Sequence, residues 1–209
     1  MQKMNEIMLY LDKLIPNPAC ELNYTKDYEL LIAVMLSAQT TDKRVNMVTK
    51  ILFDKYPTLE SLDKAEIEDI INIIRSIGNY NKKALNIKLI ANDLLIKSNG
   101  KVPNNREFLE SLSGVGRKTT NVVLSNLFNE PCIAVDTHVA RVSIRLGLAK
   151  PKDNVLVIEK KITKLVPVDR RLRIHHQLVL FGRYYCKAKK PLCKDCGLIN
   201  ICKEKQKSI

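Results

Sequence analysis

The chain has 209 residues, 45% hydrophobic and 27% charged, a balance that is ordinary for a globular protein and argues against a disordered polypeptide. Lys and Arg number 35 against 22 Asp and Glu, and this net charge of +13 favours either a polyanionic partner or a well-solvated basic surface. The longest uncharged apolar stretch, residues 30–41, is too short to span a bilayer, and the N-terminus lacks a signal-peptide core. We therefore expect a cytoplasmic protein with no membrane partner.

Helical periodicity dominates the chain. Apolar residues recur every three or four positions over 67–74, over 87–95 and over 155–165. Gly78, Asn99-Gly100 and Pro167 follow these three runs as stop signals. The best candidate for a strand is the four-residue run Cys132–Val135, and no linker divides the chain. We expect an all-α fold of about ten helices with short loops.

The segment SLSGVGRKTTNVVL, residues 111–124, reads as a helix-hairpin-helix corner. Gly114 and Gly116 predict a tight turn, and a run with helical potential follows from Thr119. The free N–H groups of such a turn, together with the next helix's N-terminus, suit one phosphate. A simple corner between two helices explains the glycines equally well, whereas their spacing excludes a P-loop.

Lys118 lies in the first turn of that second helix, beside the positive end of its dipole. If it is also partly desolvated, its ammonium form is disfavoured and the free amine becomes a nucleophile able to form a Schiff base. The alternative is a solvated lysine or one that pairs with a phosphate.

Asp136 stands in the segment IAVDTHVARV, residues 133–142, at the point where an apolar run gives way to helical spacing. The position predicts a helix N-cap. A carboxylate at the rim of a cleft is the second interpretation, since it could act as a base or stabilise developing positive charge.

Four cysteines cluster near the C-terminus with the spacing C-x6-C-x2-C-x5-C: Cys186, Cys193, Cys196 and Cys202. Structural zinc usually takes two C-x2-C pairs, and only one is present. An iron–sulfur cluster tolerates unequal spacings and is favoured over zinc, which stays open. Cys20 and Cys132 lie outside this group, and we expect them to be small buried apolar residues.

Taken together, these segments resemble the endonuclease III family, which are DNA glycosylases and lyases of the helix-hairpin-helix superfamily. The hairpin, IAVDTHVARV and the cysteine spacing match in the family's order, as do SAQTTD at 37–42 and GNYNKKA at 78–84. The resemblance implies two α domains with the active site in a cleft between them. Residues 20–130 would form a six-helix barrel, and residues 1–19 with 131–209 would form the second domain.

The resemblance also implies a reaction on duplex DNA that contains damaged pyrimidines or abasic sites. Lys118 would attack C1′ of a flipped-out nucleotide, release the base and form a Schiff base whose elimination cuts the strand on the 3′ side. Asp136 would activate the lysine and stabilise charge at the sugar. Gln39 and Asn79 would fill the gap and contact the opposite strand. A backbone phosphate would bind the main-chain N–H groups of the hairpin residues Gly114, Val115 and Gly116.

The four clustered cysteines would hold a structural [4Fe–4S] cluster, and the resemblance implies a monomer. Ser113 departs from the family's usual proline and Asn79 from its usual apolar wedge, and neither position touches the chemistry. The adenine glycosylase of the same superfamily lacks a hairpin lysine, so Lys118 argues against it. A monofunctional mismatch glycosylase and a non-catalytic DNA-binding or redox-sensing iron–sulfur protein are the remaining alternatives.

Overall fold

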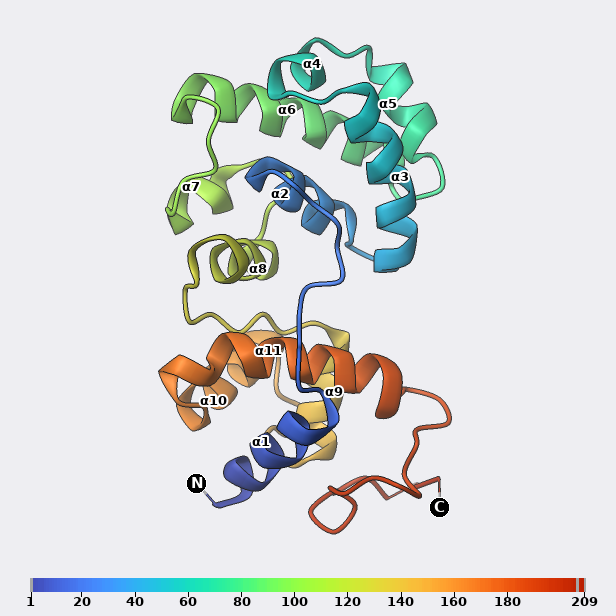
Figure 1. Ribbon diagram of the computed structural model, residues 1–209, viewed down its shortest axis with the longest axis vertical. Helices are drawn as coiled ribbons and strands as arrows, with labels where there is room; N and C mark the ends of the chain where they lie inside the picture. The colour runs from blue at the N-terminus through green and yellow to red at the C-terminus, as the bar shows by residue number, and fades with distance from the viewer. Residues whose placement is uncertain (1, 206, 209) are drawn as a thin grey trace. The chain divides into compact units, whose positions relative to one another are not determined.

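The computed structural model describes residues 2–205 and 207–208. Every regular element in these residues is helical, which confirms the predicted all-α class: eleven α-helices, a 3₁₀ turn and a π-helical segment (Figure 1). The run Cys132–Val135, expected as the best strand candidate, forms no strand. A strand needs a neighbour with which to pair, and the described residues offer none. Its apolar side chains, Ile133 to Val135, are buried in an irregular connection instead.

The chain divides into two compact units, Glu21–Phe128 and Met1–Cys20 together with Asn129–Ile209. The first unit contains α2 Asp27–Leu36, α3 Asp42–Lys55, α4 Leu59–Lys64, α5 Ile67–Ile74, α6 Tyr80–Ser98, α7 Arg106–Ser111 and α8 Arg117–Phe128. The second contains α1 Gln2–Leu14, α9 Thr137–Arg145, α10 Val155–Leu165, η1 Val168–Arg170, α11 Arg171–Leu180 and η2 Phe181–Tyr185.

Helix α2 is the centre of the unit Glu21–Phe128. Its residues 28–36 are all buried, and all of them except Glu29 are hydrophobic, as expected for a helix enclosed on every side. Helices α3, α6 and α8 pack against it, and α6 runs along α4 and α5 (Figure 1). The loop after α2, the loop before α6 and the turn before α8 are therefore all anchored to one hydrophobic core.

Short polar side chains start several helices. Each accepts a hydrogen bond of 2.9–3.3 Å from a backbone N–H in the first turn. These N-caps are Thr41 of α3, Thr58 of α4, Asn105 of α7 and Asn154 of α10. Helix α6 ends where the sequence predicts, at Asn99 and Gly100, which both take positive φ.

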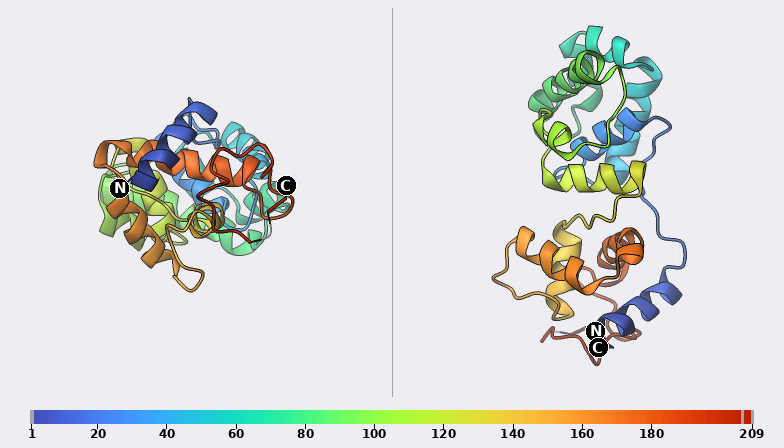
Figure 2. Two further views of the ribbon diagram at one scale, coloured as in Figure 1. Left: turned by 90° about the horizontal axis from the view of Figure 1, so that it is seen from below. Right: turned by 90° about the vertical axis from the view of Figure 1, so that its left-hand side faces the viewer.

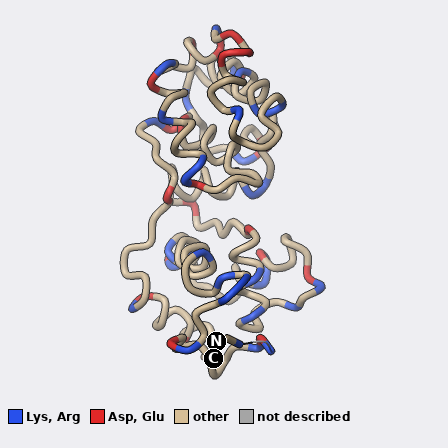
Figure 3. The backbone as a smooth tube through the Cα atoms, turned by 90° about the vertical axis from the view of Figure 1, so that its right-hand side faces the viewer, with Lys and Arg blue, Asp and Glu red and all other residues tan. Residues whose placement is uncertain are grey.

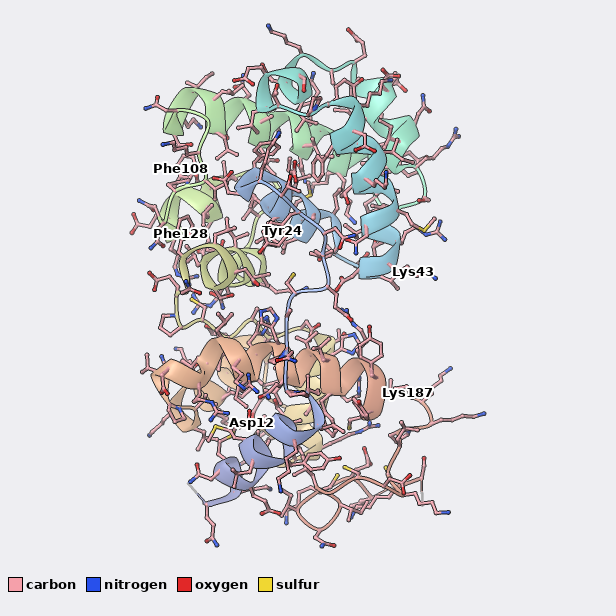
Figure 4. The ribbon with its side chains drawn as sticks, viewed as in Figure 1. Asp12, Tyr24, Lys43, Phe108, Phe128 and Lys187 are labelled. Atoms are coloured by element: carbon pink, nitrogen blue, oxygen red, sulfur yellow. The ribbon has the colours of Figure 1, made fainter. Side chains whose placement is uncertain are left out.

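The second unit closes α1 against α11. Asp12 lies on α1 (Figure 4), and Arg170, Arg173 and Gln177 donate hydrogen bonds of 2.6–3.0 Å to its carboxylate. Burial raises the pKa of Asp12, but the hydrogen bonds from these side chains outweigh it and lower the pKa to about 2. α1 also lies beside the C-terminal loop (Figure 2), since a Cβ on Gly197 would meet the ring of Tyr10 at 2.6 Å.

Basic residues are spread along both units rather than gathered in one segment (Figure 3). None of the helices within residues 2–205 has the length and apolar character needed to cross a membrane.

Candidate functional site

Residues 106–128 form the predicted helix-hairpin-helix, with α7 and α8 joined by the turn 112–116. The backbone N–H of Val115 donates to the carbonyl oxygen of Leu112 at 3.1 Å, and the buried side chains of both residues anchor the turn. Helix α8 begins at Arg117, two residues before the helical run expected from Thr119.

The two glycines of the hairpin differ in backbone conformation and in the space around them. Gly114 has a φ of 76°, and a Cβ there would lie 2.2 Å from Nδ2 of Asn86. Gly116 lies outside the left-handed region, and a Cβ there would meet nothing within 4 Å. The chain itself therefore requires glycine at 114 but not at 116, where the close approach of another molecule is the remaining physical reason.

Ser113 gives the hairpin a contact that a proline could not make. Its Oγ donates to Oδ1 of Asn86 at 2.7 Å, and Asn86 is a buried residue of α6. The departure from the family's usual proline therefore exchanges a rigid residue for a hydrogen bond that ties the turn to α6.

Lys118 is the second residue of α8, and its side chain is exposed. The first turn of α8 contains no acidic residue, so the ammonium group faces the positive end of the helix dipole uncompensated within that turn. The exposure agrees with the alternative of a solvated lysine, and the condition of partial desolvation is not met by this chain alone. The helix N-terminus is the influence that the structure retains.

Asp136 is the N-cap of α9, which confirms the simpler of its two interpretations. Its Oδ1 accepts a hydrogen bond of 2.8 Å from the backbone N–H of Val139. The side chain is half-buried, and its other oxygen receives no hydrogen bond from the part of the chain that the structure describes. Lys118 and Asp136 belong to different compact units.

Gln39 and Asn79 share an unusual backbone. Both are exposed, and both have left-handed φ values, 59° and 58°. Gln39 lies between the end of α2 and the start of α3, and Asn79 is the N-cap residue of α6. A left-handed glutamine is uncommon and costs free energy, which is typical of backbone held in place for function.

Lys83 is a residue that sequence reasoning missed. It lies on α6, is 6% exposed, and its Nζ donates to the carbonyl oxygens of Leu36 and Ala38 at 2.9 and 2.7 Å. Burial lowers the pKa of its ammonium group. The available signal was its position: Lys83 is four residues before Ile87, on the buried apolar stripe of α6.

The four clustered cysteines line one cavity, together with Phe181, Tyr185 and Arg145 among others. Burial raises the pKa of the Cys186 thiol, opposed by Arg145, whose Nη1 lies 3.4 Å from Sγ. Within the described residues, no three His, Cys, Asp or Glu side chains are grouped closely enough to hold a single metal ion. Cys20 and Cys132 are half-buried, so the expectation of full burial is wrong.

Comparison with known proteins identifies the family. A family model described as HhH-GPD superfamily base excision DNA repair protein matches residues 32–168. Endonuclease III of Bacillus subtilis is 46% identical over 210 residues, covering 99% of this chain and 96% of that protein. Endonuclease III of Escherichia coli is 45% identical and covers 98% of this chain and 97% of its own length. The chain belongs to the endonuclease III family.

Solved structures agree with this membership. A trapped covalent intermediate of an endonuclease III with DNA matches with a TM-score of 0.94 and 47% identity, over 97% of this chain and 95% of that one. A thermostable thymine-DNA glycosylase matches with a TM-score of 0.80 and 25% identity, over 95% of this chain and 93% of that one. These matches confirm the resemblance that the hairpin, the segment IAVDTHVARV and the cysteine spacing indicated. The chain is a base excision repair enzyme of the endonuclease III type.

Proposed function

We propose that this chain removes damaged pyrimidines from duplex DNA as a glycosylase and cuts the strand 3′ to the resulting abasic site as a lyase, with Lys118 as nucleophile. The observation that carries the proposal is the exposed amine of Lys118 at the start of α8, directly behind the hairpin. It stands in a chain 47% identical to an endonuclease III that has been trapped covalently on DNA.

In this reaction the unprotonated amine of Lys118 attacks C1′ of an extruded nucleotide. The C1′–N bond breaks, its electron pair leaves with the base, and the base takes up a proton. A proton then passes from the new C1′–N group to the ring oxygen, which opens the sugar and leaves a Schiff base. Loss of a proton from C2′ expels the 3′ phosphate, and water finally hydrolyses the Schiff base to free the lysine.

Asp136 supplies the carboxylate for this chemistry. The hydrogen bond from Val139 fixes one oxygen, and the second oxygen is left to accept a proton from Lys118 or to face the positive charge that develops at the sugar. The helix cap and the catalytic role therefore use different oxygens of one side chain.

The hairpin would hold a backbone phosphate close to the reacting sugar. The backbone N–H groups of Gly114 and Gly116 have no acceptor among residues 2–205, and the N-terminus of α8 adds the positive end of its dipole. The open space where a Cβ of Gly116 would lie lets the phosphate approach the main chain. Such contacts position DNA without reading its sequence.

Gln39 and Asn79 would occupy the gap left by the extruded nucleotide. Both are exposed and have left-handed backbone, one in the loop between α2 and α3 and the other at the start of α6. Their amide groups can donate and accept hydrogen bonds, so they suit the unpaired base of the opposite strand. A polar Asn79 in place of an apolar wedge favours hydrogen bonding over stacking at that position.

The clustered cysteines would hold a [4Fe–4S] cluster. The four thiols line one cavity, and their unequal spacing, with a single C-x2-C pair, fits such a cluster better than zinc. The ligands would be Cys186, Cys193, Cys196 and Cys202. When bound, the cluster supplies cross-links that hold residues 186–202 folded. Brown colour and iron in the purified protein support this, whereas a colourless zinc protein would contradict it.

The deciding experiment is borohydride trapping on a labelled duplex with one thymine glycol. Wild-type protein should give a covalent adduct and a cut strand, and Lys118→Gln should give neither while still binding the duplex. Lys97→Gln is the matched control, since it removes one exposed lysine from the same unit. Equal trapping by Lys118→Gln and wild type would exclude Lys118 as nucleophile. Base release without an adduct would instead indicate a monofunctional glycosylase.

A further inference from the structure

Lys83 is a buried cation that forms no ion pair with the residues that the structure describes. An ammonium group removed from water is costly unless it is fully hydrogen-bonded, and the two bonds it makes within the described residues go to main-chain carbonyls. Burying a lysine in this way needs a reason beyond packing, because an apolar residue would continue the buried stripe of α6 at lower cost.

The two carbonyls lie at the start of the loop that carries Gln39. Leu36 is the last residue of α2, and Ala38 directly precedes Gln39. Carbonyls at a helix C-terminus are the negative end of the dipole, so they attract a cation there. The Lys83 side chain therefore fixes the peptide that leads into a left-handed glutamine.

The main chain of the same residue reaches the second loop. The backbone N–H of Lys83 donates to the carbonyl oxygen of Asn79 at 3.0 Å and so forms the first turn of α6 behind that left-handed residue. One residue thus contacts both loops, through its side chain on one side and its backbone on the other.

Helix α6 also contacts the hairpin turn, residues 112–116. Asn86 accepts the hydrogen bond from Ser113, and its amide nitrogen lies against Gly114. Asn79, Lys83 and Asn86 follow one another at four and three residues, so they share one face of the helix. That face contacts or carries the Gln39 loop, the Asn79 loop and the hairpin.

We infer that Lys83 is a positioning residue that holds the Gln39 loop in register with the Asn79 loop along α6. The inference rests on the proposed function, because it matters only if both loops enter DNA at the same gap. Without the two hydrogen bonds the loops still exist, but their separation is no longer fixed before DNA binds. The expected loss falls on duplexes in which the two loops must fill the gap together and face an unpaired base.

The chain offers a matched control on the same helix. Lys88 also donates two hydrogen bonds to backbone carbonyls, those of Asp63 and Ala65, but these lie at the C-terminal end of α4. Lys83→Met and Lys88→Met therefore remove the same kind of contact from one helix, and only the first faces a loop proposed to enter DNA.

The first test needs no DNA. Hydrogen–deuterium exchange at residues 37–40 should accelerate in Lys83→Met by about tenfold and stay at the wild-type rate in Lys88→Met. Lys83→Arg, which can still donate to both carbonyls, should keep most of the protection. Lys83→Gln, whose shorter side chain cannot reach both carbonyls, replaces Lys83→Met if that variant fails to fold. Unchanged exchange at 37–40 in Lys83→Met would overturn the inference whatever the enzyme's substrate.

The second test separates positioning from general damage to the fold. Lys83→Met should lower excision from a fully paired damaged duplex by about tenfold or more. Borohydride trapping at an abasic site opposite a one-nucleotide gap should fall by less than about threefold, because no opposite base has to be held. Equal losses on both substrates, or the same split in Lys88→Met, would contradict the positioning role. Inactivity of wild type on every damaged duplex would refute the proposed function and leave the exchange test standing.

Discussion

The starts of α8 and α9 answer the same electrostatic problem in opposite ways. Each helix begins with unpaired backbone N–H groups and the positive end of its dipole. Helix α9 is capped by Asp136, whose carboxylate accepts a hydrogen bond from one of these N–H groups. Helix α8 begins with Arg117 and Lys118 and has no acidic residue in its first turn. Where a helix start carries the wrong charge for its own stability, an external anion can complete it. The start of α9 is thus stabilised by its own chain, whereas the start of α8 is the one at which we propose that a DNA phosphate binds.

The largest effect is expected when the start of α8 is made to resemble that of α9. Lys118→Glu should abolish adduct formation and strand cleavage, a loss of at least about 1,000-fold, because the nucleophile is gone. The same change should raise the free energy of unfolding by about 0.5–1 kcal/mol, because an acid replaces a cation beside the dipole. Trapping assays and urea unfolding measure the two quantities. A less stable variant would show that the Lys118 side chain makes a stabilising contact after all.

A smaller effect is expected at α9, where two variants separate the cap from the charge. Asp136→Asn should slow base removal by about 100-fold, because a neutral amide cannot take the proton or face a cation. Its free energy of unfolding should stay close to wild type, because Asn caps a helix as well as Asp does.

Asp136→Ala should lose similar activity and also about 1 kcal/mol of stability, because the bond from Val139 is lost. Single-turnover base release and thermal unfolding check both variants. Wild-type turnover by Asp136→Asn would leave Asp136 with the cap as its whole role.

The smallest effects on activity are expected in the hairpin, where the two glycines should respond differently. Gly114→Ala should lower the free energy of unfolding by about 1–3 kcal/mol, because φ is positive there and Asn86 occupies the space of the added carbon. Gly116→Ala should leave unfolding within about 0.5 kcal/mol of wild type.

Gly116→Ala should instead weaken binding to an abasic-site analogue by about tenfold, because the methyl group stands where the phosphate approaches. Fluorescence anisotropy measured at one fixed salt concentration tests this. Full affinity in Gly116→Ala would remove the main argument for a phosphate at the hairpin.

Features set by local sequence were predictable. The all-α class follows from helical periodicity, the end of α6 from Asn99-Gly100, and the cap of α9 from Asp136 standing where helical spacing resumes. The segments that reveal the family are also local, since each is a short motif with its own spacing. These features depend on neighbouring residues along the chain, which the sequence displays directly.

Features set by tertiary context were not predictable. Cys132–Val135 has strand composition, but no strand lies beside it in the described residues. The motif GNYNKKA, residues 78–84, does not reveal the role of Lys83, because that role depends on carbonyl groups more than forty residues earlier in the chain. The hairpin glycines looked equivalent until the position of Asn86 on α6 distinguished them.

The second unit is built from two segments that the ribosome synthesises at different times. Asp12 on α1 bonds Arg170, which leaves the ribosome 158 residues later, at translation rates a delay of roughly 10–30 s. During that interval the continuous stretch Glu21–Phe128 can fold around α2. Ile7 and Leu11 of α1 stay exposed until the later residues that form their core, from Ile133 onward, have been synthesised. The nascent chain therefore completes its hairpin-bearing half first, and its first helix is among the last to be buried.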